Sequence, residues 1–495
     1  MNKILSAVLL VTAINACTLQ EEPDPATGGG AITITAQTVQ EQDVTNVPGT
    51  KTTLSGDEGL ETHWVAGADK IGIFSPQART TGGSETPIKN AEFTAQTSAK
   101  SSNFTGTMFW GADGNHDFYA YYPRNPEFTG ERTVVPVSLA SAQSQSEGGN
   151  SAHIGALDYM VATPLTVARG GAVNFTFNHV FSMIEFQITG SDSGSLSAVR
   201  LSGDDSDNPL AYAGTIDLTQ DPGESPYTIN NQSSIARDVT VSLSTAADLS
   251  TTTPVSVYMM VLPGTHPNNV SILLQIDSGW KSMTITPPPG GFVRGKKYQI
   301  SVFHDSRDGN LYSYRTYGSQ VWMTKNMAYL PSVVGPGTGS NSTAYYYVYG
   351  YNGSDVATAE ATDNYSTYGV LYNWTAAQSA CPSGWHLPSD AEWTTFTDDL
   401  GGASVAGGKL KEAGFSHWTS PNIGATNESG FTALPGGYRH FNGACSYIGI
   451  YGYWWSSTVI DTTYAWTRNL TYDLSLVFRG NLSKALGFSV RCVRD

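Results

Sequence analysis

Charge is scarce in this chain, and positive charge is the scarcer sign. Of its 495 residues 14% are charged, with 26 Lys and Arg against 42 Asp and Glu, so the formal net charge is −16. Nucleic-acid binding needs clustered Lys and Arg, and so does electrostatic binding to an anionic lipid surface. We therefore expect no nucleic-acid partner. Gly, Ser, Thr and Tyr are abundant instead, which is typical of β-rich extracellular proteins.

Motifs for metal and phosphate chemistry are missing as well. The sequence has no HExxH, its nine histidines are scattered, and no glycine-rich phosphate loop occurs. Asp305–Asn310 carries carboxylate and amide oxygens around a glycine, as a calcium loop would, but it lacks the later glutamate of an EF-hand. The favoured interpretation of this segment is an ordinary turn between domains. We expect no cofactor, no metal site and no enzymatic activity.

The N-terminal hydrophobic run, Ile4 to Ile14, is too short to span a bilayer. It predicts a cleaved signal peptide over residues 1–16. The next residue, Cys17, ends "INAC", which resembles a bacterial lipobox; an ordinary secretory signal with an incidental cysteine is the alternative. The lipobox predicts a surface-exposed lipoprotein of the outer membrane, anchored through acyl chains on Cys17. The acidic "QEEPD" after it resembles the export signal of surface lipoproteins of the Bacteroidetes, and residues 17–30 form a tether rich in proline and glycine.

Cysteine is rare. With Cys17 lipidated, only Cys381, Cys445 and Cys492 remain, in an oxidising compartment where disulfides persist. Three is an odd number, so one thiol is left over or pairs elsewhere.

Strand patterns fill residues 31–304. Ala31–Val39 and Val270–Ile276 alternate apolar and polar residues, which indicates strands with one buried face. The alternation that includes Val173 and Phe177 changes phase before Ile184, which indicates a bulge or a strand that passes from one sheet to the next. The length favours two tandem antiparallel β-sandwiches, at residues 31–182 and 183–304.

The composition changes after residue 304. Most tryptophans and the convincing helices lie beyond it, which predicts an α+β domain over residues 305–495. In "CPSGWHLPSDAEW", Ser389 and Glu392 form a capping box that starts a helix, with Trp393 on its buried face. We interpret this stretch as scaffolding. The alternative is that Cys381 and His386 within it are a nucleophile and its base.

Six segments follow one another between residues 51 and 302: KTTL, HWVAGADKIGIF, FYAYYP, DYMVA, FNHVFSMIEFQI and RGKKYQISV. Together they resemble the fimbrillin family, the pilins of the Bacteroidetes. The resemblance implies two successive transthyretin-like β-sandwiches, and assembly by donor-strand exchange with other pilin subunits, a form of β-strand addition. It also implies that Ala31–Val39 is a removable propeptide strand. Lys51 is the possible cleavage site, because it is the only basic residue between Cys17 and Lys70.

The C-terminal segments DGNLYSYRTYGSQVWMTKNM, GVLYNW, CPSGWHLPSDAEW, NESGFTALPGGYR, YWWSST and GFSVRCVRD resemble the major paralogous domain of Fibrobacter. The implied fold is similar to a C-type lectin or to the formylglycine-generating enzyme. The resemblance implies a disulfide between Cys381 and Cys492, which leaves Cys445 as the odd thiol. The sugar-binding triads Glu-Pro-Asn and Trp-Asn-Asp of C-type lectins are absent from the sequence. The resemblance therefore does not imply calcium-dependent sugar binding for this chain.

Exposed aromatic side chains are the remaining candidates for ligand binding, because Tyr and Trp stack on sugars and anchor protein partners. For any single ring a place in the core is the favoured alternative. The pair Cys445 and His440 is a further candidate, with an idle thiol as the favoured alternative. The predicted ligand-binding residues are Tyr345, Tyr347, Tyr349, Tyr447 and Tyr451.

These features predict a cell-surface adhesin. We expect a fimbrial tip or accessory pilin whose lectin-like domain, a closed recognition head standing apart from the sheets, binds a host or microbial glycan or a protein. The alternative is a lipoprotein outside any pilus that binds glycans.

Overall fold

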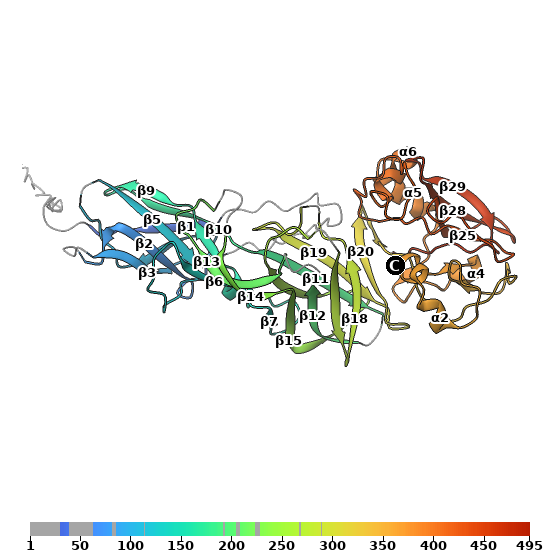
Figure 1. Ribbon diagram of the computed structural model, residues 1–495, viewed down its shortest axis with the longest axis horizontal. Helices are drawn as coiled ribbons and strands as arrows, with labels where there is room; N and C mark the ends of the chain where they lie inside the picture. The colour runs from blue at the N-terminus through green and yellow to red at the C-terminus, as the bar shows by residue number, and fades with distance from the viewer. Residues whose placement is uncertain are drawn as a thin grey trace, which may run out of the picture.

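The computed structural model describes residues 30–38, 63–81, 86–112, 114–191, 194–203, 208–222, 228–266, 269–288 and 290–495. The expected signal peptide, Cys17 and Lys51 lie outside these residues. Within them the protein is mainly β, and its cores follow one another along the long axis of the molecule, with the C-terminal domain at one end (Figure 1). No helix in the described part of the chain is long and apolar enough to cross a membrane.

The first core lies inside one eight-stranded sheet. Its order is β2-β3-β4-β1-β10-β8-β5-β9, and β2 also pairs with β5, so the sheet curves back on itself. Trp64 is fully buried at its centre, with its ring edge-on to Phe104, Tyr122 and Phe177 at 5.1, 5.4 and 5.3 Å between centroids. The strands are β1 Ile34–Thr38, β2 Lys70–Arg79, β3 Pro87–Ala95, β4 Ser101–Gly106, β5 Asn115–Tyr122, β8 Met160–Ala162, β9 Leu165–Ala168 and β10 Val173–His179.

The change of phase between Phe177 and Ile184 marks a change of sheet. Strand β10 ends at His179 in the first sheet, and β11 begins at Ser182 in a sheet of the second sandwich. Val180 and Phe181 between them are both buried, which breaks the alternation. The second of the two interpretations, a chain that passes from one sheet to the next, is therefore the correct one.

The second core lies between a five-stranded sheet, β18-β17-β12-β15-β7, and the strands β16-β11-β19 of a seven-stranded sheet. A three-stranded sheet, β14-β13-β6, adds to it. The elements are β6 Val135–Ser138, β7 Ala142–Gln145, α1 Ile154–Leu157, β11 Ser182–Gly190, β12 Ser195–Ser202, β13 Ala211–Ile216, β14 Asn230–Ala236, β15 Asp238–Asp248, β16 Val255–Val261, β17 Val270–Ile276, β18 Gly279–Ile285 and β19 Lys297–His304.

The expected division of the sandwiches at residue 182 is wrong for one segment. Strands β6 and β7 precede that residue, yet they pair with β13 and β15 of the second sandwich, and Val135 and Val137 belong to its core. The physical reason is that period two shows which face of a strand is buried but not which strand lies beside it. Most pairings are antiparallel, as expected, although β1–β10, β11–β19 and β7–β15 are parallel.

The C-terminal domain has two cores rich in aromatic rings and little regular structure. The capping box of α5 is confirmed: Ser389 Oγ accepts the N–H of Glu392, and the Glu392 carboxylate accepts the N–H of Ser389 at 2.7 Å. The elements are β20 Leu311–Tyr317, β21 Gln320–Met323, β22 Tyr346–Tyr347, α2 Val356–Glu360, α3 Asp363–Tyr368, β23 Leu371–Tyr372, α4 Trp374–Ala377, β24 Trp385–His386, α5 Asp390–Asp399, α6 Ala403–Leu410, β25 Tyr438–Arg439, β26 Cys445–Ser446, β27 Tyr451–Val459, β28 Tyr464–Thr471, β29 Phe478–Ser483 and β30 Val493–Arg494.

The expectation that this domain stands apart from the sheets is wrong. The seven-stranded sheet runs β16-β11-β19-β20-β21-β30-β24, so it begins in the second sandwich and ends in the C-terminal domain (Figure 1). The turn between β19 and β20 causes this continuity. The N–H of Asp305 donates to Asn310 O and that of Gly309 to Asp305 O, which closes a hairpin and aligns the two strands.

Candidate functional sites

Strand β1 is the first candidate site, because it fills a slot in the middle of the first sheet. It runs parallel to β10 and antiparallel to β4. Its side chains Ile34 and Ala36 are 2% and 0% exposed, and Ile32 just before it is 5% exposed. The Trp64 indole N–H donates to Ala36 O at 3.2 Å. A sheet without β1 would present two unpaired strand edges and a row of apolar pockets.

Strand β1 contacts its neighbours through ladder hydrogen bonds and buried side chains. Residues 39–62, which follow it in the sequence, lie outside the described residues. A strand of the same alternating pattern from another chain would satisfy the same donors, acceptors and pockets.

The second candidate site is a group of rings that we call the tyrosine cluster: Tyr438, Tyr447, Tyr451 and Tyr453. Tyr453 stacks on the buried ring of Phe488 at 4.9 Å between centroids. Tyr451 lies 5.8 Å from Tyr453, and Tyr447 lies 5.2 Å from Tyr451 and 5.9 Å from Tyr438. The cluster thus rises from the core to Tyr447, which is 50% exposed.

The backbone holds this cluster in place. Tyr438 pairs with Ser446 in the β25–β26 hairpin, and Gly437 before it has φ +61°. A Cβ at Gly437 would lie 2.4 Å from Ser446 O and 3.0 Å from the ring of Tyr349, so only glycine fits. Tyr447 itself has φ +65° at the start of a turn in which its carbonyl accepts the N–H of Tyr451. The exposed ring therefore sits on a fixed turn.

The phenol of Tyr453 stays neutral at neutral pH. Burial raises the pKa of Tyr453 to about 12, and the neighbouring Tyr451, Tyr438 and Tyr447 act in the same direction. A neutral phenol both donates and accepts hydrogen bonds, and its ring offers a flat apolar face. This combination suits a sugar ring or a protein side chain.

A family model described as fimbrillin-like matches residues 33–308, which is more than half of the chain. The chain belongs to the fimbrillin-like family. A second model, the Fibrobacter succinogenes major domain, matches residues 316–494. Both resemblances inferred from the sequence motifs are thereby confirmed.

Solved structures similar to this fimbrillin-like protein include proteins of Bacteroides and Parabacteroides. A candidate cell adhesion protein of Bacteroides ovatus is 13% identical, covers 58% of this chain and 96% of its own, with a TM-score of 0.39. One of Bacteroides uniformis is 17% identical, with coverages of 57% and 94% and a TM-score of 0.37. A fimbrial protein of Bacteroides ovatus is 12% identical, with coverages of 94% and 99% and a TM-score of 0.28. No curated protein matches the chain.

The five tyrosines of the fimbrillin-like protein that were predicted to bind ligand differ in position and exposure. Tyr447 and Tyr451 lie together in the tyrosine cluster, and the half-buried Tyr349 borders it. Tyr345 is half-buried, and its backbone N–H donates to Asn373. The prediction that Tyr347 binds ligand is wrong: it is 1% exposed and its hydroxyl donates to a backbone carbonyl. Strand β22, which carries Tyr347, covers only two residues.

Sequence reasoning did not select Tyr438 and Tyr453 for the cluster. Tyr438 stood inside the motif NESGFTALPGGYR, and Tyr453 at the start of the motif YWWSST. Trp454 and Trp455, which follow Tyr453, are buried, at 1% and 0% exposure. Alternation along β27 carried a signal for Tyr453, because Tyr451 and Tyr453 share one face of that strand.

The stretch around Cys381 is scaffolding in this structure. Cys381 and Cys492 form a disulfide, so neither offers a thiolate. His386 lies between two carboxylates, with Nδ1 2.6 Å from Asp495 Oδ1 and Nε2 2.8 Å from Glu392 Oε1. Burial opposes the charge on His386, but the hydrogen bonds to Asp495 and Glu392 outweigh it and raise its pKa. The His386 ring ties Glu392, in the first turn of α5, to Asp495.

Cys445 and His440 do not form a nucleophile pair in the described structure. Cys445 is a free, half-buried thiol whose Sγ accepts the N–H of Gly350 at 3.4 Å. The His440 ring packs on Phe441, 4.0 Å between centroids, and no hydrogen bond joins it to the thiol in the described part of the chain. The idle thiol is the interpretation that this geometry favours.

The loop Asp305–Asn310 joins the second sandwich to the C-terminal domain. Asp305 is fully buried and its carboxylate accepts from the Arg307 guanidinium at 2.7 Å. Arg307 also donates to Ala380 O at 2.7 Å and packs over the ring of Tyr329, 4.0 Å from its centroid. Asp305 therefore neutralises an arginine that crosses the domain boundary. The described residues contain no group of three His, Cys, Asp or Glu placed to hold a metal ion.

Proposed function

We propose that this protein is a cell-surface adhesin, a tip or accessory subunit of a fimbrium. In this proposal its first sandwich joins a neighbouring subunit by β-strand addition, and its C-terminal domain presents the tyrosine cluster to a ligand. The observation that carries the proposal is the position of β1, with two strand edges and buried apolar pockets around one short segment. Membership of the fimbrillin-like family supports the same assembly.

The proposed place at the end of a fimbrium follows from the connection between domains. Strand β20, directly after the second sandwich, pairs with β19 on one side and β21 on the other. No free strand therefore follows the second sandwich in the described chain, so this end has none to donate. Such a subunit can accept a strand from a neighbouring subunit but can donate none. The filament therefore ends at this subunit. The lipid on Cys17 would hold the chain at the outer membrane before assembly.

The ligand-binding part of the proposal is tested by removing two rings of the tyrosine cluster, Tyr447→Ala with Tyr451→Ala. One exposed aromatic anchor contributes about 2 kcal/mol or more to binding, which is roughly thirty-fold in Kd, so the loss of both rings should raise Kd by at least that factor. The measurement is binding of the full chain to an array of glycans and matrix proteins. Tyr464→Ala is the control, because Tyr464 is 43% exposed and lies outside the cluster.

The double variant should lose the array signals of the wild-type chain, and the control should keep them. Equal binding by all three proteins would exclude the tyrosine cluster as the ligand site.

A further inference from the structure

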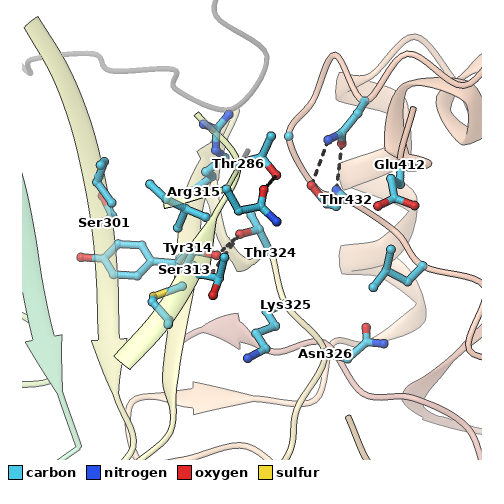
Figure 2. A pocket seen from close by; sticks show the side chains of 18 of the residues that line it. Thr286, Ser301, Ser313, Tyr314, Arg315, Thr324, Lys325, Asn326, Glu412 and Thr432 are labelled. Carbon is cyan, nitrogen blue, oxygen red and sulfur yellow. Dashed lines mark hydrogen bonds between the residues drawn. The ribbon is translucent and has the colours of Figure 1, made fainter. Parts of the chain in front are cut away.

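A cleft of about 1150 Å³ lies between the second sandwich and the C-terminal domain. Figure 2 shows it between strands β19 and β20, which carry Ser301 and Tyr314, and the C-terminal segment that carries Glu412 and Thr432. The cleft shares no lining residue with the tyrosine cluster. It is therefore a separate candidate site.

Four cationic side chains line this cleft: Arg315, Lys325, Arg491 and Arg494. Within the described residues none of the four has a carboxylate within ion-pair distance. Two glutamates also line the cleft, and one of them, Glu412, already binds His417 at 2.9 Å. In a chain of net charge −16, this is a local excess of positive charge.

The partners that these cations do have are neutral. Arg315 Nη1 donates to Ser429 O at 3.3 Å, and Arg491 Nε donates to Asn326 Oδ1 at 2.7 Å. Nε and Nη2 of Arg494 are buried and have no hydrogen-bond partner. In the described structure the Arg494 guanidinium lies over the rings of Tyr314 and Trp385, 4.4 and 4.8 Å from their centroids.

Lys325 has no hydrogen bond or ion pair in the described structure, and its side chain extends into the cleft (Figure 2). Burial, together with Arg491, lowers its pKa against the attraction of Asp308. Burial also lowers the pKa of Arg491 to about 9. Holding unpaired cations in a partly buried site is unfavourable, and an anion in the cleft would remove that penalty. Because low-dielectric walls focus the field of the cations, the cleft attracts anions even though the whole chain is acidic.

The uncharged polar side chains that line the cleft set a second requirement for the chemistry of its ligand. Hydroxyl side chains from both β strands and connecting segments, including Thr286, Ser301, Ser313 and Thr324, face the cleft (Figure 2). Gln299 adds an amide oxygen that is buried without a partner. Hydroxyls and amides both donate and accept, so they match a ligand that carries many hydroxyl groups.

We propose that the cleft binds an acidic oligosaccharide, one whose carboxylate or sulfate groups reach the four cations and whose hydroxyls pair with the Ser, Thr and Gln side chains. This inference does not depend on strand exchange or on the tyrosine cluster. An acidic peptide meets the charge requirement but makes no use of so many hydroxyl groups.

The test compares Lys325→Met with Lys89→Met in the full chain. Lys89 lies on β3, far along the molecule in Figure 1, and pairs with Glu131, so its variant removes one positive charge outside the cleft. The probes are a heparin-derived hexasaccharide for sulfate, hexagalacturonate for carboxylate, maltohexaose as the neutral sugar, and a hexaglutamate peptide. Kd is measured by calorimetry in low and high salt, and urea midpoints report folding.

We expect at least one acidic hexasaccharide to bind the wild-type chain and Lys89→Met, less tightly in high salt, and maltohexaose not to bind. Loss of one charge-assisted hydrogen bond should raise Kd about ten-fold in Lys325→Met. Arg315→Gln should do the same and replaces Lys325→Met if that variant is unfolded. The proposal is overturned if neither acidic sugar binds, if the cleft variants and Lys89→Met bind equally, or if only the peptide binds.

Discussion

Replacing Ile34 with aspartate should lower the free energy of unfolding of the first sandwich by about 3–5 kcal/mol, because it places an unpaired carboxylate in the core. The Ile34 side chain is 2% exposed and lies between β4 and β10. Gln37→Asp is the matched control, since Gln37 is an exposed residue of the same strand. Urea unfolding followed by tryptophan fluorescence measures the difference, and Trp64 reports on this core.

A lower pH should recover part of the lost stability of Ile34→Asp, because a protonated carboxyl is easier to bury. If Ile34→Asp and Gln37→Asp unfold at the same urea concentration, β1 does not occupy the slot in solution. The proposal of strand exchange would then lose its structural basis.

Cys492→Ser should destabilise the C-terminal domain by about 4–5 kcal/mol, since the disulfide closes a loop of 111 residues in the unfolded chain. The bond also fastens Cys492, which is buried in an aromatic core, to the segment between α4 and α5 that carries Cys381. The measurement is the unfolding free energy with and without a reducing agent. Cys445→Ser is the control, because Cys445 is a free thiol.

Reduction should shift the wild-type chain toward the stability of Cys492→Ser and leave that variant unchanged. A wild-type chain that unfolds identically with and without reductant would show that the disulfide does not contribute to stability.

Local patterns in the sequence predicted local structure well. Alternation identified the buried face of β10, and the change of phase near Ile184 located the passage between sheets. The capping box predicted the start of α5, and the disulfide between Cys381 and Cys492 has the pairing that the resemblance implied. Each of these signals lies within a few residues or in a motif.

Partners far apart in the sequence could not be predicted in the same way. Nothing in the residues 135–145 shows that β6 and β7 join the second sandwich rather than the first. The hairpin at Asp305–Asn310 was identified as a turn, but a turn does not reveal that its strands continue one sheet across two domains. The cations of the cleft come from three separate segments, each unremarkable alone, and only the fold brings them together.

The proposed assembly requires that β1 give way to a neighbour's strand when the protein enters a fimbrium. The most direct measurement is mass spectrometry of the chain in fimbriae sheared from cells, with amine labelling of the intact protein before digestion. We expect the chain to be present there, its first residue to lie after Lys51, and peptides from Ala31 to Thr38 to be missing. Recovery of the chain in that fraction with Ala31–Thr38 intact, or its absence from the fraction, would contradict it.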